Sequence, residues 1–259
     1  MSTNQTISHN SDFATYLGDS IRQHQGWTTL ETFGQLLSEQ ALDDRAVKYF
    51  LASTACFFRE IPSGILALAL RVTDDRIDND RFGAVSSAAS ILLAAVDEYG
   101  LGSNSTKINN NHHQLFAAMA KRFGVSESEL NNPDFILPEA IDLAQVTRQL
   151  YREGDIAKGI GFHFASEITS DREFELCYKG MAGHLPAYAD DSAHIAPEKF
   201  LDFYYVHTVV EPEHGSASAQ AVNLYGDSEI DRQALLDGAF QFMEAYGAFW
   251  LAVNRTLQH

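Results

Sequence analysis

The chain has 259 residues, of which 45% are hydrophobic, so it is long enough to bury a sizeable core. Its 35 acidic side chains outnumber its 18 basic ones and give a formal net charge of -17. This charge argues against nucleic acid or an anionic membrane surface as a partner. The longest strongly apolar stretch, residues 64–70, is too short to span a bilayer.

The two cysteines, Cys56 and Cys177, are far apart and each lies in an apolar segment. Buried thiols fit this arrangement better than a disulfide does. The polar N-terminus has no signal-peptide pattern, so we expect a cytoplasmic protein. The expected partner is a small-molecule substrate, and a homodimer is left open.

Helical signals follow one another through most of the chain, and almost nothing reads as a strand. Residues 1–10 are expected to be a disordered tail, and residues 102–111 a polar loop. Pro62 and Gly64 should kink or break the helix that contains them. Helices are expected over residues 16–21, 29–37, 45–72, 86–99, 112–123, 138–151, 156–168 and 171–181, then from Pro197, and finally after a cap at Ser228. This pattern predicts a single all-α domain, residues 1–259, with the helices packed as a bundle.

A helix in the last third of the chain carries the most informative motif, His207-x3-Glu211-x2-His214. Steps of four and three residues place the three side chains on one helix face. Two imidazoles and a carboxylate so arranged can bind a divalent metal, and such mixed ligands suit iron or manganese. The alternative is a solvated polar stripe. However, Phe200 and Phe203 continue the same face as an apolar stripe, which predicts that the motif points into the protein.

A second metal ion would need further ligands, and three other segments contain candidates. Glu98 ends the helix over 86–99 with small residues one turn before it, although a surface carboxylate at a helix end would look the same. His112 opens the next helix, where a capping or packing role is the alternative. Glu167 lies in an apolar run and needs a salt bridge or a metal as partner. His163, one turn earlier, could contact a ligand or substrate, and a core histidine is an equal alternative.

Five stretches, in order along residues 45–224, resemble the haem-oxygenase-like diiron oxidases, a family of iron-containing redox enzymes. Each stretch is a weak signal alone, but their shared order is specific. The stretches are Phe58–Val72, Asp97–Gly100, the His-x-x-Leu-Phe segment that begins at His112, Ala165–Glu167, and His207–His214.

The resemblance implies a seven-helix bundle related to haem oxygenase, which holds two iron ions and uses O2 as co-substrate. It implies six metal ligands: Glu98, His112, Glu167, His207, Glu211 and His214. The chain departs from the family at Glu211, where aspartate is usual, and at Pro212, which should bend the ligand helix. The loop before the second ligand is also longer, which leaves His113 and Asp97 as alternative ligands.

The resemblance further implies a non-haem diiron oxidoreductase. The expected substrate is a free amino acid or an amino-acid-derived metabolite in specialised metabolism, and the reaction is N-oxygenation, oxidative C–C cleavage or decarboxylation. Arg148 and Arg152 could bind a substrate carboxylate, with surface arginines as the alternative. The competing hypotheses are a metal-free, thiaminase-like or cofactorless enzyme or binding module of the same fold, and a fatty-acid oxidative decarboxylase.

Overall fold

The structure, a computed structural model, describes residues 13–101, 111–188 and 195–257. The expected tail at residues 1–10 and nearly all of the expected loop at 102–111 lie outside these ranges. The described residues form helices and one 3-10 turn but no strand, which confirms the all-α class. The elements are α1 (Phe13–Arg22), α2 (Gln25–Glu39), α3 (Asp44–Phe58), α4 (Ile61–Arg76), α5 (Arg81–Glu98), α6 (His112–Arg122), α7 (Glu127–Leu130), η1 (Pro133–Phe135), α8 (Pro138–Arg152), α9 (Ile156–Ala182), α10 (Leu185–Tyr188), α11 (Pro197–Phe200), α12 (Asp202–Tyr225) and α13 (Glu229–Thr256).

The predicted number of seven helices is wrong, because the described residues form thirteen α-helical segments. Three of them, α7, α10 and α11, are four-residue turns within connections. The helix expected over 45–72 is two helices, because α3 ends at Phe58 and Pro62 lies in the first turn of α4. The two helices expected over 156–168 and 171–181 are instead one 27-residue helix, α9. Its polar Thr169 does not interrupt it, because the hydroxyl donates back to the Ala165 carbonyl.

Capping residues set two helix starts that hydrophobic periodicity places too late. The Asp80 side chain caps α5, which starts at Arg81 rather than at residue 86. The His24 imidazole caps α2, which starts at Gln25 rather than at residue 29. Ser228 caps α13, as predicted.

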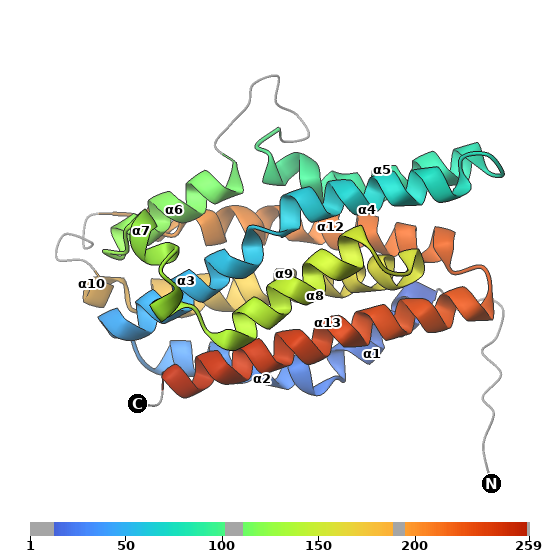
Figure 1. Ribbon diagram of the computed structural model, residues 1–259. Coiled ribbons are helices and arrows are strands. Elements are labelled where there is room, and N and C mark those ends of the chain that lie inside the picture. Colours follow the sequence, from blue (N-terminus) through green and yellow to red (C-terminus); the bar gives the residue numbers. More distant parts are fainter. Residues whose placement is uncertain (1–12, 102–110, 189–194, 258–259) are drawn as a thin grey trace, which may run out of the picture.

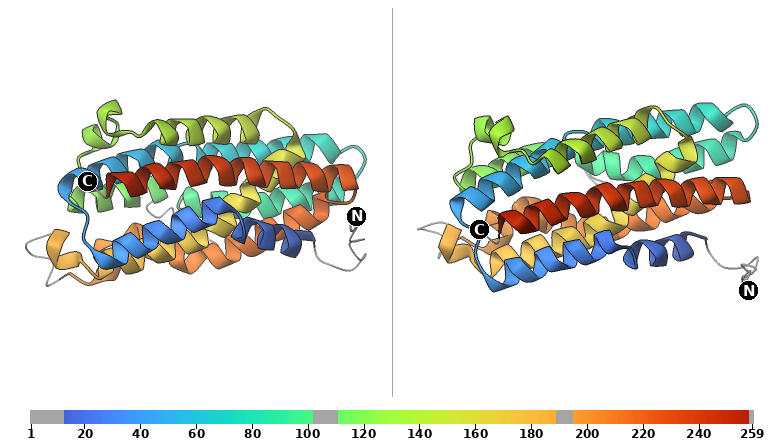
Figure 2. Two further views of the ribbon diagram at one scale, coloured as in Figure 1. Left: turned by 90° about the horizontal axis from the view of Figure 1, so that it is seen from below. Right: turned by 60° about the horizontal axis from the view of Figure 1, so that its bottom comes forward.

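The long helices lie side by side in an elongated bundle (Figure 1). α9 packs against both α12 and α13, while α4 and α5 pack together along one edge (Figure 2). Two glycines bring α9 and α13 into backbone contact. A Cβ at Gly161 would lie 1.9 Å from the Leu235 carbonyl oxygen, and one at Gly238 would lie 1.9 Å from the Lys158 carbonyl oxygen. These backbone contacts therefore fix the position of α9 relative to α13.

Buried apolar side chains from these helices join in one contiguous cluster. Cys56 and Cys177 are buried free thiols, as predicted. No helix in the described parts of the chain is long and apolar enough to cross a membrane. α12 remains a single helix through Pro212 and packs against α5, α6 and α9. These four helices carry the polar side chains of the candidate site.

Candidate metal centre

Six histidine and glutamate side chains gather between α5, α6, α9 and α12 in two groups of three. The first group is Glu98, His112 and His207, and the second is Glu167, Glu211 and His214. Within each group, one candidate ligand atom from each residue lies within 4.8 Å of the others. The structure thus brings together the six residues that the resemblance implied as ligands. Their binding of metal stays a prediction.

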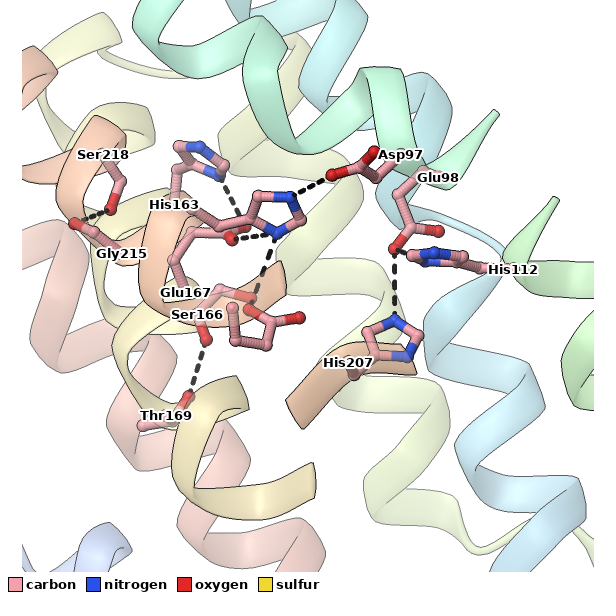
Figure 3. Close-up of polar contacts among 12 residues, drawn as sticks. Asp97, Glu98, His112, His163, Ser166, Glu167, Thr169, His207, Gly215 and Ser218 are labelled. Atoms are coloured by element: carbon pink, nitrogen blue, oxygen red, sulfur yellow. Dashed lines mark hydrogen bonds and ion pairs between the residues drawn. The ribbon is translucent and has the colours of Figure 1, made fainter. Parts of the chain in front are cut away.

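Glu98 joins the two histidines of the first group (Figure 3). Its Oε1 lies 2.9 Å from His112 Nδ1 and 3.7 Å from His207 Nε2. The His207 Nδ1–H donates to the Phe203 carbonyl oxygen at 2.7 Å, which leaves Nε2 facing Glu98 with its lone pair. The His207 ring also contacts Phe174 and Phe203, with centroid distances of 4.0 and 4.4 Å. Backbone and packing therefore both hold this imidazole.

His214 is surrounded by three carboxylates in and around the second group. Its Nδ1 lies 3.6 Å from Glu167 Oε2 and 3.7 Å from Glu211 Oε2. Its Nε2 donates to Asp97 Oδ2 at 2.9 Å. This hydrogen bond leaves Nδ1 as the atom that faces the other two ligands, as in a carboxylate–histidine–metal arrangement.

Burial and neighbouring charges shift the proton affinities of these groups. Burial and the Glu211 carboxylate raise the pKa of Glu167 to about 8. Burial disfavours the charged form of His214, but the hydrogen bond to Asp97 and the nearby carboxylates of Glu211 and Glu167 outweigh burial and raise its pKa to about 11. Burial also opposes ionisation of Glu98, yet the neighbouring His112 and His207 hold its pKa below the usual range. A cation that binds the second group would have to displace protons.

The second group contains a buried oxygen without a hydrogen-bond partner. Glu211 is only 4% exposed, and its Oε2 accepts no hydrogen bond from any residue in the described ranges. An unpaired buried carboxylate oxygen is costly, and a bound cation would satisfy it. Three imidazoles and three carboxylates are also the donors that iron and manganese accept. The residues therefore fit a pair of divalent metal ions.

Asp97 is expected to position His214 rather than to bind metal. Replacing it in the variant Asp97→Ala removes the acceptor that orients the imidazole, so metal affinity should fall by about 10–100-fold. Asp97→Asn keeps a side-chain oxygen that can accept the same hydrogen bond, and its effect should be smaller. Co(II) titration followed by visible absorbance measures both variants. Equal affinity in Asp97→Ala and the unaltered chain would contradict this role.

All six candidate ligands line one cavity, whose empty volume is ≈ 640 Å³ including its mouth. The rest of the lining is mostly apolar and includes five aromatic side chains, the phenylalanine wall: Phe57, Phe58, Phe116, Phe174 and Phe203. No lysine or arginine of the described ranges lines it. The cavity therefore combines the six candidate ligands with apolar side chains that exclude water.

The remaining predicted site residues belong to neither group of three. His163 is buried behind Glu167, with Nδ1 3.4 Å from the Glu167 Oε1 and 3.2 Å from the Tyr151 hydroxyl. Burial and the nearby His214 lower the pKa of His163 to about 3, so it is a neutral partner of Glu167. His113 lines the cavity but is exposed and belongs to neither group of three.

Arg148 and Arg152 have partners within the protein. Arg148 donates two hydrogen bonds to the Glu60 carboxylate, at 2.7 and 3.1 Å, and Arg152 donates one to the Ser63 hydroxyl at 2.6 Å. Neither lines the cavity with the six candidate ligands. Their role in substrate binding stays a prediction that this placement does not favour.

Sequence reasoning missed two features of the site. It treated Asp97 as an alternative ligand rather than as the acceptor for His214. It also omitted Phe174, which contacts His207 and lies seven residues after Glu167 on α9, the spacing that places two side chains on one helix face. That spacing was the signal available for Phe174.

Residues 81–247, more than half of the chain, match the family described as iron-containing redox enzymes. The chain belongs to this family. Among proteins similar to this iron-containing redox enzyme is the 4-chloro-allylglycine synthase of Streptantibioticus cattleyicolor. It is 26% identical over 217 residues, which cover 84% of this chain and 74% of the relative.

Solved structures of similar shape support the fold of this iron-containing redox enzyme. A CADD-like protein of unknown function from Nostoc punctiforme superposes with a TM-score of 0.70 at 18% identity, over 94% of this chain and 96% of that one. A domain of unknown function with a haem-oxygenase-like fold from Shewanella denitrificans superposes with a TM-score of 0.60 at 11% identity, over 95% of this chain and 90% of that one. The predicted haem-oxygenase-like fold is therefore confirmed.

Proposed function

We propose that the chain is an O2-dependent, non-haem diiron oxidase or oxygenase that acts on a free amino acid or an amino-acid-derived metabolite. The observation that carries this proposal is the pair of buried groups, each of three histidine and glutamate side chains, on the floor of one cavity. When bound there, iron would supply the electrons and open coordination positions that O2 chemistry requires.

The protein's own residues would hold and orient this centre. Glu98, His112 and His207 would bind one ion, and Glu167, Glu211 and His214 the other. The Phe203 carbonyl and the Asp97 carboxylate orient one imidazole in each group. The phenylalanine wall keeps water away from the same space, and this strengthens the electrostatic interactions within it.

An amino-acid substrate is supported by the relative from Streptantibioticus cattleyicolor, whose name specifies an amino-acid product. A substrate carboxylate in this cavity would meet no lysine or arginine of the described ranges, so the metal ions themselves are its natural partner. The apolar wall would contact the rest of the substrate. That wall also favours a second candidate, oxidative decarboxylation of a fatty acid.

An anaerobic Fe(II) titration followed by exposure to O2 tests the proposed function. We expect two Fe(II) ions per chain and an O2-dependent absorbance change that a panel of free amino acids accelerates. Mass spectrometry of the reacted amino acid would distinguish N-oxygenation from C–C cleavage or decarboxylation. Acceleration by fatty acids alone would favour the second candidate. No uptake of iron would instead favour a metal-free enzyme or a binding module.

A further inference from the structure

A second cavity shares two of the six candidate ligands with the first. It lies between α1, α9 and α12 and has an empty volume of ≈ 880 Å³ including its mouth. Its deepest polar residues are Glu167 and Glu211, which also line the first cavity. The two cavities therefore meet at these two residues.

Small side chains keep this second cavity open. Gly18 and Ala14 of α1 face Gly215 and Ala219 of α12 across it. A Cβ at Gly215 would meet no atom within 4 Å, so the space beside this glycine is empty (Gly215 is labelled in Figure 3). α12 therefore leaves an opening one helical turn beyond Glu211.

Charge along the second cavity favours a cation. An exposed carboxylate, Asp171, lies at its mouth, and the carboxylates of Glu167 and Glu211 lie at its inner end. Arg22 is the one basic side chain among its described lining residues, and 52% of that side chain is exposed near Asp19, 3.4 Å away. Partial burial and the charges of Glu211 and Glu175 raise the pKa of Asp171, and they outweigh the opposing charges of Arg172 and Arg22.

The first cavity offers a poorer route for a hydrated ion, because five phenylalanine side chains line it. By contrast, carboxylate oxygens at the mouth and at the inner end of the second cavity could replace water ligands as an ion moves inward. The unpaired Glu211 Oε2 is a ready acceptor at the inner end.

We infer that the cavity between α1, α9 and α12 is the entrance through which divalent metal ions reach the two groups of three, with Asp171 as the first carboxylate they meet. This inference rests on the proposed function, because it requires that the six side chains bind metal. The acidic entrance should also draw cations from solution and so raise the rate of uptake at low ionic strength.

Stopped-flow mixing of the metal-free chain with Co(II) tests the entrance. Gly215→Leu should fill the opening, since a Cβ at this position meets no atom within 4 Å, and should slow Co(II) uptake by about tenfold or more. Removal of Co(II) by a chelator should slow by the same factor, because both directions use one route. Stoichiometry and equilibrium affinity should then stay unchanged. The size control Gly215→Ala should take up Co(II) at the original rate.

A second variant tests the charge. Asp171→Asn should slow uptake by about threefold at low salt and have no effect at high salt. An unchanged rate in Gly215→Leu would overturn the inference, and so would a lower stoichiometry at the original rate. If Gly215→Leu fails to fold, an unchanged low-salt rate in Asp171→Asn overturns it instead. A complete failure of the unaltered chain to bind Co(II) would refute the proposed function as well, so the two failures are distinguishable.

Discussion

Replacing His207 or His214 by alanine should reduce bound iron from two ions to one per chain and abolish the O2-dependent absorbance change. Each histidine belongs to a different group of three, so each variant removes one neutral nitrogen ligand from one ion. His214→Ala would leave two carboxylates in its group, and His207→Ala would leave one carboxylate and one imidazole in the other. Two protein ligands are too few for tight binding. Anaerobic Fe(II) titration counts the ions, and rapid mixing with O2 reports the absorbance change.

The neighbouring pair His112 and His113 provides a matched control. His112 is buried, with its Nδ1 2.9 Å from Glu98 Oε1, whereas His113 is exposed. His112→Ala should therefore lose one ion, and His113→Ala should bind two. Full iron binding in both His207→Ala and His214→Ala would refute the assignment of the ligands. A larger loss in His113→Ala than in His112→Ala would refute the position of the ligand in α6.

Local spacing was sufficient to predict one wall of the candidate centre. His207, Glu211 and His214 recur at four and three residues, and α12 is a helix throughout this stretch, so the three side chains face the same region. The flanking Phe200 and Phe203 supplied the rest of that prediction. Nothing in this argument required knowledge of another helix.

The other candidate ligands could not be derived from spacing, because they meet only through tertiary packing. Glu98 and His112 are separated by fourteen residues and lie on different helices, and Glu167 comes from a third. Only the resemblance placed them together. The sequence also could not predict which ring nitrogen of each imidazole faces the candidate site. That choice depends on distant partners such as Asp97, which is 117 residues away from His214. Likewise, Arg148 is occupied by Glu60, 88 residues distant, which no local pattern reveals.

Gly161→Ala is expected to destabilise the fold strongly, because α9 and α13 touch through their backbones at this position. The new Cβ would lie 1.9 Å from the Leu235 carbonyl oxygen, and a backbone atom cannot move aside as a flexible side chain can. Separating the helices should lower the free energy of unfolding by about 1–3 kcal/mol or more. Since α9 also carries Glu167, Co(II) affinity should fall in the same variant. Thermal unfolding and Co(II) titration measure the two effects.

Gly215→Ala is the matched control, because this glycine is also inside a long helix but its Cβ would meet open space. Alanine is favoured over glycine in a helix interior by about 0.8–1 kcal/mol, so this variant should unfold at a slightly higher temperature. Replacing glycine by alanine is thus expected to raise the unfolding temperature at Gly215 and to lower it at Gly161. If both variants were stabilised, the backbone contact between α9 and α13 would be refuted.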